Sequence, residues 1–398
     1  MRDFTGAPLG DDTTGEMAGS ENGIERGSSA ATLPPAPHTN AIPPDLAFLF
    51  NAGETPWAPL PTIVARPNVP LTTETIELED DFMIGANEAL LASNGPTRLL
   101  RSWNSPDILN DGVIWIQSTT TETRTIAESY WGTITNNGDI ISLSKTGNAF
   151  GYMDSARGVV ANNGNIVAIS SHANVIAFGT YQGASSGAGH TNSGLIEAWA
   201  GQRASGAWFA NSSAFENSGT IRAQGLSGAT GVEFQRDGDL TNSGLIEAAS
   251  DEGTAIGVHL YWQGDSVIDN SGTIRAATAI HASYQYDDTI EINNGASGRV
   301  EGDVTLWGSV DAVTNNGVIT GNVSLGEHDD VYTQTTGQLD GWLDLGSGND
   351  IANTDTGNQI IFGGDGNDTI HAGAGSDIIG GGRGADLLDG GSGRDTAD

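Results

Sequence analysis

The chain has 398 residues, with 50 acidic and 15 basic side chains, so its formal net charge is −35. Such a charge repels nucleic acid and anionic membranes, which bind basic surfaces, and it attracts cations. The sequence contains no cysteine, so no disulfide can stabilise it, and bound metal is the alternative cross-link. These features exclude a nucleic-acid-binding role and favour a cation-dependent fold.

The first residues differ in composition from the rest of the chain. The opening "MRDFTGAPLGDDTTGEM" has no basic region followed by an apolar stretch, and no apolar run in the sequence is long enough to span a bilayer. We therefore predict no Sec signal peptide and no transmembrane segment. Eleven of the 13 prolines lie in residues 1–71, which predicts a disordered, Pro-rich N-terminal segment. The apolar cluster "DLAFLF", Asp45 to Phe50, leaves local docking open as an alternative.

A motif of the form Asn-x-Gly, followed by a β-branched apolar residue, recurs through residues 72–324 at intervals of 22–30 residues. A period in this range is typical of a solenoid. Asn and Gly suit tight corners, and the β-branched residue suits a strand, so stacking would align these residues. Leucine-rich repeats are the main alternative, but their leucine spacing is missing. We predict an all-β fold, a right-handed parallel β-helix of about nine coils.

The motif begins at Asn110, Asn136, Asn162, Asn192, Asn217, Asn242, Asn270, Asn293 and Asn315. The residues predicted to form one inward ladder are Ile114, Ile140, Ile166, Ile196, Ile221, Ile246, Ile274 and Ile319, with Val300 in the same place.

The residue that follows the inward position alternates in charge over five coils. It is glutamate or arginine in turn: Glu197, Arg222, Glu247, Arg275 and Glu301. Stacked parallel strands would place these side chains next to one another on the outer face. Opposite charges at adjacent positions stabilise such a sheet, whereas like charges destabilise it. The alternation therefore predicts in-register stacking.

The segment 325–398 is built from nine-residue units rich in Gly and Asp. Units begin at residues 345, 354, 363, 372, 381 and 390, and an earlier unit, "LGEHDDVYT", begins at Leu325. The glycines allow sharp turns that bring carbonyl oxygens inward, and the Asp at the sixth position of a unit supplies a carboxylate. Calcium takes about six to eight oxygen ligands of these kinds. The acid content of the tail thus predicts several bound Ca2+ ions.

The four final units follow the pattern G-G-x-G-x-D-x-U-x, in which U is a large apolar residue, and "LGSGNDIAN" follows it in part. The pattern resembles the RTX family, whose members contain hemolysin-type calcium-binding nonapeptide repeats. The resemblance implies a parallel β-roll over 325–398 in which two units form one turn. It also implies a calcium ion between the loops of units i and i+2. Because relatives usually continue beyond such repeats, we expect the roll to be truncated and the sequence to be a fragment.

By the same resemblance, the sixth positions of the units lie on two faces of the roll. One face holds Asp350, Asp368 and Asp386, and the other holds a neutral Gln359 with Asp377 and Asp395. The residues predicted to bind calcium, through carboxylates or loop carbonyls, are Asp330, Gly346, Gly348, Asp350, Gly363, Gly364, Gly366, Asp368, Gly373, Gly375, Asp377, Gly381, Gly382, Gly384, Asp386, Gly390, Gly391, Gly393 and Asp395.

No catalytic motif is found in the sequence. The order of β-helix and repeats resembles that of alginate epimerases and some polysaccharide lyases, but the H-E-x-x-H and G-x-S-x-G motifs are missing. Four histidines, His172, His190, His259 and His281, fall in different coils, where a histidine is usually structural. We assign no catalytic residue and no cofactor other than Ca2+.

The leading interpretation is a calcium-binding protein with a structural, adhesive or surface-associated role. It would be extracellular, exported without an N-terminal signal peptide by type I secretion, and its partner would be a cell surface or an extracellular polysaccharide. The alternative is a lyase or epimerase that acts on polysaccharide, with the calcium-binding roll as an export and folding module. A groove with converging carboxylates would favour the enzyme.

Overall fold

The computed structural model describes residues 44–51, 54, 56–58, 60, 71–72, 75–78, 81–93, 98–102, 107–127, 132–154, 158–181, 189–261, 264–283, 288–308 and 310–398. The chain divides into two compact units, Met1–Ala30 and Ala31–Asp398, and every described residue belongs to the second. Most of the N-terminal segment that the composition predicts to be disordered therefore lies outside the described residues.

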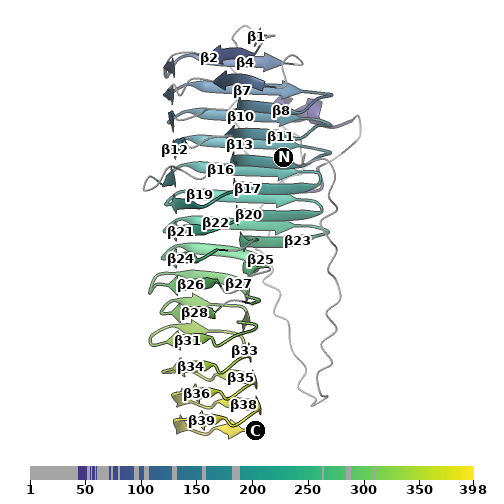
Figure 1. Cartoon of the computed structure of the whole chain (residues 1–398). Coiled ribbons are helices and arrows are strands. Elements are labelled where there is room, and N and C mark those ends of the chain that lie inside the picture. Colours follow the sequence, from purple (N-terminus) through teal and green to yellow (C-terminus); the bar gives the residue numbers. More distant parts are fainter. Residues whose placement is uncertain are drawn as a thin grey trace. The chain divides into compact units, whose positions relative to one another are not determined.

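Successive coils of strand form a parallel β-solenoid (Figure 1). All the pairings between described strands are parallel, and the strands form a 25-stranded sheet, a 14-stranded sheet and a two-stranded sheet. Within the described part of the chain, the helical structure is limited to the 3-10 helix η1 (Pro44–Leu49). The all-β fold and the parallel solenoid predicted from the repeat period are thus confirmed. No helix of the described residues is long and apolar enough to cross a bilayer.

The 14-stranded sheet contains β3 (Phe82–Ile84), β6 (Ile108–Asn110), β9 (Thr133–Asn136), β12 (Val159–Asn162), β15 (His190–Asn192), β18 (Ser213–Asn217), β21 (Gly238–Asn242), β24 (Ser266–Asn270), β26 (Thr289–Asn294), β28 (Val310–Asn315), β31 (Val331–Gln334), β34 (Ile351–Thr354), β36 (Thr369–His371) and β39 (Leu387–Asp389). The two-stranded sheet contains β37 (Ala374–Gly375) and β40 (Ser392–Gly393).

The 25-stranded sheet contains β1 (Leu71–Thr72), β2 (Ile76–Leu78), β4 (Ala89–Ser93), β5 (Arg98–Ser102), β7 (Val113–Ser118), β8 (Thr123–Ala127), β10 (Asp139–Ser144), β11 (Ala149–Asp154), β13 (Asn165–Ser170), β14 (Val175–Thr180), β16 (Leu195–Ala200), β17 (Arg203–Phe209), β19 (Thr220–Gly225), β20 (Gly228–Phe234), β22 (Leu245–Ser250), β23 (Thr254–Leu260), β25 (Thr273–Ala282), β27 (Arg299–Thr305), β29 (Val318–Ile319), β30 (Val323–Ser324), β32 (Gln338–Leu339), β33 (Leu343–Ser347), β35 (Ile360–Asp365), β38 (Ile378–Arg383) and β41 (Thr396–Ala397).

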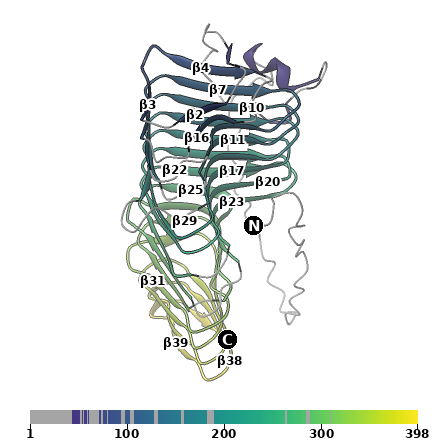
Figure 2. The same ribbon diagram turned by 45° about the horizontal axis from the view of Figure 1, so that its top comes forward.

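The coils shorten toward the C-terminus. Stacked partners are 26 residues apart where Ile140 pairs with Ile166, and 18 apart where Ile361 pairs with Ile379. The wide coils each contribute three strands, such as β12, β13 and β14, and the long strand β25 pairs with both β22 and β23. The solenoid is accordingly wide in its N-terminal coils and narrower in its C-terminal ones (Figure 2).

The apolar interior is built on the predicted ladder of β-branched residues. Each member pairs in register with the next, from Ile114 through Val300 to Ile319, and every member is at most 1% exposed. A coil alone could not bury such a residue, because its neighbours above and below provide the contacts. The register predicted from the motif spacing is therefore confirmed along the whole ladder.

A second ladder of buried asparagines runs along one corner of the coils. From Asn110 to Asn294, each amide Nδ2 donates a hydrogen bond of 2.7–2.9 Å to the Oδ1 atom of the next asparagine, so these buried groups satisfy one another. The adjacent glycine allows this packing. At Gly194, for example, a Cβ atom would collide with the carbonyl oxygen of Gly164. The members are Asn110, Asn136, Asn162, Asn192, Asn217, Asn242, Asn270, Asn294 and Asn315.

The coil whose motif begins at Asn293 differs from the others in which asparagine is buried. Asn294, not Asn293, occupies the buried position, whereas Asn293 points outward and donates a hydrogen bond to Asp269. In the other coils the inward apolar residue follows the asparagine by four positions, but Val300 follows Asn294 by six. The turn closed by the hydrogen bond from Gly298 N–H to the Gly295 carbonyl holds the extra residues.

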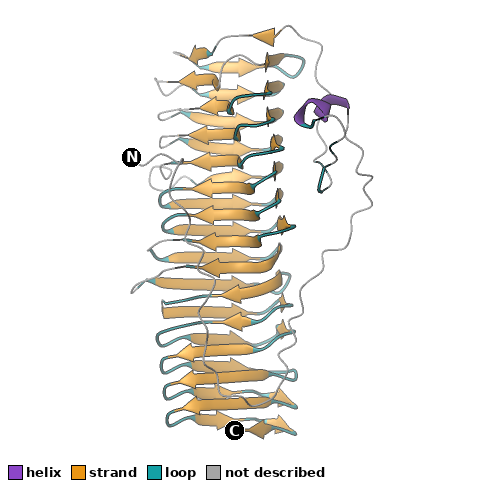
Figure 3. Ribbon diagram, turned by 90° about the vertical axis from the view of Figure 1, so that its right-hand side faces the viewer, coloured by secondary structure: helices purple, strands orange, loops and turns teal. Residues whose placement is uncertain are grey.

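Part of the segment predicted to be disordered packs against the solenoid (Figure 3). The helix η1 buries Leu46 and Leu49 against outward-facing apolar side chains of the N-terminal coils. Trp57 stacks on Trp199 with ring centroids 5.0 Å apart, and the Lys145 ammonium donates a 3.1 Å hydrogen bond to the Phe50 carbonyl. The apolar surface that this segment covers consists of two adjacent outer rows, which would otherwise be exposed. One row is Leu91, Trp115, Ile141 and Val167, and the other is Leu143, Ile169 and Trp199.

The sheets continue without a break through the predicted boundary at Leu325. Strand β31 pairs with β28 on one side and with β34 on the other. The division into a β-helix at 72–324 and a roll at 325–398 therefore stays a prediction. It is based on a change in residue composition, since the sheets themselves continue across this boundary.

The alternating row of charges begins where the apolar row from Leu91 to Val167 ends. Val167 pairs with Glu197, and the row then continues in register through Arg222, Glu247 and Arg275 to Glu301. The Arg222 Nε atom is 3.1 Å from a Glu247 carboxylate oxygen, and an Arg275 guanidinium nitrogen is 3.2 Å from the other. The predicted external ladder is thus confirmed.

The ladder gives a test of how charge pairing stabilises the stack. The Arg222→Glu substitution would place three glutamates in succession and replace two attractive pairs by two repulsive ones. We expect the free energy of unfolding to fall by about 1 kcal/mol at low salt. At 1 M salt the loss should shrink, because the Debye length is then only about 3 Å. Denaturant unfolding at both salt concentrations measures the difference.

The matched control is Arg236→Glu, which makes the same charge change at an exposed turn that follows β20. It should cost little at either salt concentration. Equal losses from the two variants would contradict the pairing across coils.

Candidate calcium sites

The nine-residue units stack two per turn. Pairs 18 residues apart recur on both sides of the narrow coils, as in Ala352 with Ile370 and Ile361 with Ile379. Their inward side chains form the thin apolar core: Ile370 and Ile379 are fully buried, and Leu388 is partly buried. The loops between these strands bring the sixth positions of alternate units into columns.

One column contains the carboxylates of Asp330, Asp350, Asp368 and Asp386. A backbone N–H of each residue donates to Oδ1 of the next carboxylate: Asp330 to Asp350 at 2.8 Å, Asp350 to Asp368 at 3.0 Å and Asp368 to Asp386 at 3.0 Å. The first three residues are at most 1% exposed. Their Oδ2 atoms are buried and accept no hydrogen bond. Each of these three carboxylates therefore presents one satisfied oxygen and one oxygen that lacks a partner.

The second column lies on the other face. Gln359 N–H donates to Asp377 Oδ1 at 2.7 Å, and Asp377 N–H donates to Asp395 Oδ1 at 3.1 Å. Asp377 is 1% exposed, and its Oδ2 atom again has no partner. The Gln359 amide Nε2 donates to the Thr356 carbonyl at 3.0 Å, so this side chain closes its own loop. The two columns contain the same residues that the sequence assigned to two faces.

The predicted glycines shape the loops around these carboxylates. At the second and fourth positions of a unit the backbone has a positive φ, such as 109° at Gly364 and 149° at Gly366, which favours glycine. A Cβ atom at either residue would collide with the carbonyl of the glycine one turn earlier, so the loop carbonyls stack closely. The same conformation or collision occurs at Gly346, Gly348, Gly373, Gly375, Gly382, Gly384, Gly391 and Gly393.

In the three units that begin with glycine, the first position is glycine for another reason. A Cβ atom at Gly363 would collide with Asp368 Oδ2, one at Gly381 with Asp386 Oδ2, and one at Gly390 with the Asp395 side chain. Glycine thus leaves free the space next to the carboxylate oxygen that lacks a hydrogen bond. Each predicted site residue therefore lies in one of the two columns or in a loop around them.

Burial makes the carboxylates of the first column costly to ionise. It raises the pKa of Asp330 to about 8 and that of Asp350 to about 7; backbone N–H donors oppose this shift, and neighbouring carboxylates add to it. Burial also raises the pKa of Asp368. A column of buried acids with unpartnered oxygens requires either protons or a cation.

The oxygen chemistry fits calcium. Carboxylates and backbone carbonyls are its ordinary ligands, and it accepts variable geometry. Among the described residues no three acidic or histidine side chains converge on one point, so a cation here would take several ligands from loop carbonyls. This is the donor set that the sequence predicted, and the assignment of individual ligands stays a prediction.

The structure adds a member to the first column that the sequence prediction did not include. Asp311 is 1% exposed, and its N–H donates to Asp330 Oδ1 at 2.7 Å. The signal was present, because "LWGSVDAVT" precedes "LGEHDDVYT" by 19 residues and has Asp at the same place. The lack of glycines at the neighbouring positions concealed it.

The histidines of the solenoid have structural environments. His190 is fully buried among Phe178 and Phe209, and burial lowers its pKa to about 4. His259 and His281 do meet, with ring centroids 5.2 Å apart, and burial lowers the pKa of His259 to about 3. Its Nε2 atom is 2.9 Å from the Ser283 hydroxyl, so this imidazole is neutral and packed.

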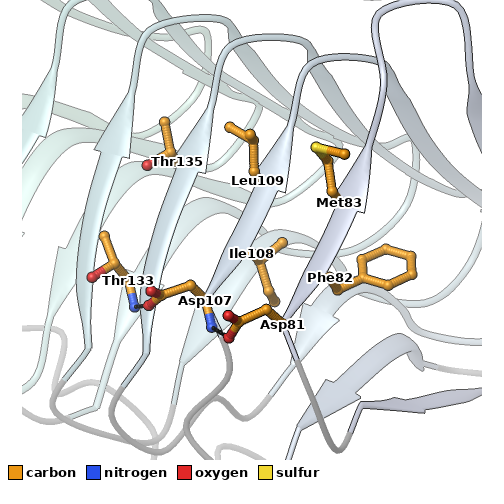
Figure 4. A pocket seen from close by; sticks show the side chains of 8 residues that line it. All are labelled: Asp81, Phe82, Met83, Asp107, Ile108, Leu109, Thr133 and Thr135. Carbon is orange, nitrogen blue, oxygen red and sulfur yellow. Dashed lines mark hydrogen bonds between the residues drawn. The ribbon is translucent and has the colours of Figure 1, made fainter.

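A shallow hollow lies on the outer face of the 14-stranded sheet near its N-terminal end (Figure 4). Its two acids are engaged by backbone groups: Asp107 N–H donates to Asp81 at 2.9 Å, and Thr133 N–H donates to Asp107 at 2.7 Å. Unlike the columns of the roll, these carboxylates are exposed to solvent, and they do not converge with a histidine or a base. The hollow therefore gives no support to the enzyme alternative.

The fold and the columns together define a parallel β-solenoid with calcium-type loops in its narrow coils. The family model of the RTX calcium-binding nonapeptide repeat, in four copies, matches residues 344–379 and 362–397. The C-terminal part of the chain thus contains RTX calcium-binding repeats, as the sequence pattern indicated. Comparisons with curated proteins and with solved structures found no match to this chain.

The neutral residue in the second column leads to a test of site strength. A calcium site between the loops of Gln359 and Asp377 would have one carboxylate, whereas one between the loops of Asp368 and Asp386 would have two. We expect Gln359→Asp to raise calcium affinity by roughly tenfold, because a second charge is added at an already buried site. Isothermal titration of the whole protein measures it.

Asp365→Asn serves as the control, since Asp365 is exposed and pairs with Arg383 outside the columns. An unchanged affinity in Gln359→Asp would contradict the assignment of Gln359 to a calcium site.

The raised pKa values lead to a pH dependence in the absence of calcium. Because these acids bind protons more tightly in the folded roll than in the unfolded chain, acid should stabilise the calcium-free roll. Stability should rise as the pH falls from about 8 toward about 4, and it should rise no further below the ordinary Asp pKa. Circular dichroism in chelator, recorded between pH 8 and 5, reports the strand content of the roll and so measures this change in stability.

The double variant Asp330→Asn, Asp350→Asn cannot titrate at these positions and should show a smaller change with pH. A calcium-free roll that loses strand content as the pH falls toward 5 would contradict the sign.

Proposed function

We propose that this protein is a secreted calcium-dependent repeat protein in which the solenoid presents a surface and calcium completes the C-terminal roll. The observation behind the proposal is the column of buried carboxylates with unpartnered oxygens, within repeats of the RTX calcium-binding type. The biological role we propose is structural or adhesive, at a cell surface or in the surrounding matrix.

Carboxylates of Asp350, Asp368 and Asp386 would hold calcium on one face, and those of Asp377 and Asp395 on the other. Stacked carbonyls of the glycine loops would supply the remaining oxygens. A bound Ca2+ ion supplies the positive charge that these buried carboxylates require. Without it they repel one another across a core of few apolar residues, so folding and binding of the segment 325–398 would be a single event. The coils of residues 72–324 have an apolar core and would not need the ion.

The location follows from the same chemistry. RTX repeats are typical of secreted proteins. Extracellular calcium modules bind in the range of about 0.1–1 mM, so a roll of this type would be folded outside cells and unfolded inside. We therefore propose export as an unfolded tail, by type I secretion, followed by folding in external calcium. The polar, strand-covered surface of the coils suits a structural role, and no described residues form a catalytic constellation that would favour the enzyme.

The whole protein at pH 7.5 gives the test. In chelator, we expect far-UV circular dichroism to show the strands of the wide coils only, and a nonspecific protease should cut mainly after residue 325. Calcium at about 1 mM should add strand signal and protect the tail, because the ion neutralises the carboxylate columns.

Magnesium at the same concentration is the control, and it should protect poorly because it requires a stricter geometry and dehydrates reluctantly. A tail that resists the protease in chelator as well as in calcium would refute the proposal.

A further inference from the structure

The unit 325–333 lies outside the residues matched by the RTX family model, which begin at residue 344. Its loop nevertheless has the same length as the matched loops on this face. Ser324 pairs with Asp344 before the loop, and Val331 pairs with Ile351 after it, so six residues lie between the flanking pairs in each unit. The stacking frame of the repeats therefore extends one turn into the coils that precede them.

The backbone of this unit also matches. Gly326 has φ 107°, against 105° at Gly346, and its carbonyl stacks directly beneath Gly346. The fourth position is His328, with φ 87°, which is the one non-glycine residue with positive φ in the described chain. Its carbonyl lies where a Cβ atom on Gly348 would collide with it, as in the glycine-only loops. This histidine thus has a positive φ, although a smaller one than the 140° to 155° of the fourth-position glycines Gly384 and Gly348, and its carbonyl lies in the same stack.

The carboxylate of Asp330 has one oxygen without a hydrogen-bond donor in this loop. The residue is fully buried. Its Oδ1 atom accepts the Asp311 N–H at 2.7 Å, while its own N–H donates to Asp350. Its Oδ2 atom is buried and has no hydrogen-bond partner. A fully buried carboxylate oxygen without a donor, inside a loop of calcium-binding shape, points to a cation ligand.

This loop differs from the others in what supports it. Its first position is Leu325, and that of the next unit on this face is Leu345; both are fully buried, whereas the later units on this face have Gly363 and Gly381 there. The coil beneath it is closed by apolar residues such as Ile319 and Val323. One coil earlier, Trp307 occupies the second position, so the glycine loop shape does not continue. The loop is therefore held on one side by a core that does not depend on calcium.

We propose that the loops of Asp330 and Asp350 hold a calcium ion outside the recognised repeats, and that this site fills first and starts the folding of the roll. The inference rests on the proposed function, since it requires that the roll binds calcium. A site with one loop next to this apolar core loses less conformational freedom on binding than a site formed by two loops that both lack such support. Each later unit would then stack on an ordered predecessor, as in other repeat proteins.

The chain offers a reporter for this site. Beyond Trp342 the sequence contains no tryptophan or tyrosine, so Tyr332, Trp342 and Trp307 are the aromatic donors near the roll. Terbium binds calcium sites and emits when a nearby indole or phenol transfers energy to it, and the transfer falls steeply with distance. The site between the loops of Asp368 and Asp386 is two strand spacings further away, roughly 10 Å.

The experiment adds Tb3+ in steps to the whole calcium-free protein. We expect sensitised emission to reach most of its final value with the first equivalent, because the site near the aromatic residues fills first. Asp330→Asn should lower this emission at least twofold and should raise the calcium midpoint for roll folding several-fold. Asp386→Asn, the matched control, should keep the emission and shift the midpoint less. His328→Gly should keep both, because glycine fits the same backbone.

Emission that grows only after later equivalents would overturn the order of filling, whether or not the variants fold. An Asp330→Asn protein with the emission and calcium midpoint of the original chain would overturn the site. Both results are distinct from failure of the proposed function, in which the original protein would bind no calcium and its tail would stay unfolded.

Discussion

In-register stacking of parallel strands is the constraint on which the rest of this structure depends, because it places each side chain next to its counterparts in the coils above and below. An apolar residue gains from such a neighbour, and an asparagine can hydrogen-bond to its own kind. A charged residue cannot stack on itself. The chain meets this difficulty in two ways: glutamate alternates with arginine on the exposed face of the wide coils, and aspartate lines cation-type loops in the narrow ones.

The register could be predicted from the sequence because the ladders repeat a chemical choice at a fixed place. The β-branched residues and the alternating charges indicated it independently, and both were right. The motif at Asn293 does not show which of its two asparagines is buried, since the two are chemically equal and only the length of the following turn decides. Asp311 was not predicted because its loop has the aspartate of the pattern but lacks the glycines. The ligand roles within the roll stay predictions, although the loops are where the pattern placed them.

The docking of η1 on the outer face of the coils could not be predicted in the same way. A short apolar cluster within a Pro-rich segment has no period, and its partner surface is assembled from seven positions spread over about a hundred residues. Only the three-dimensional stack shows that Leu91, Trp115, Ile141, Val167 and their neighbours form one outer surface that needs a cover. Local sequence patterns indicate how a coil is built, but they do not indicate which segment packs across several coils.

That cover changes how the N-terminal coils can come apart. In a solenoid each coil touches only the next, so coils can in principle open one at a time from an end. A segment that contacts Leu91 at one coil and Trp199 several coils away adds links between coils that are not neighbours. Opening any one of the covered coils then breaks contacts that the others share. This part of the stack should therefore exchange its backbone amide hydrogens as a single cooperative block. The coils beyond Trp199 should instead exchange gradually, one coil after its neighbour, as in an uncovered array.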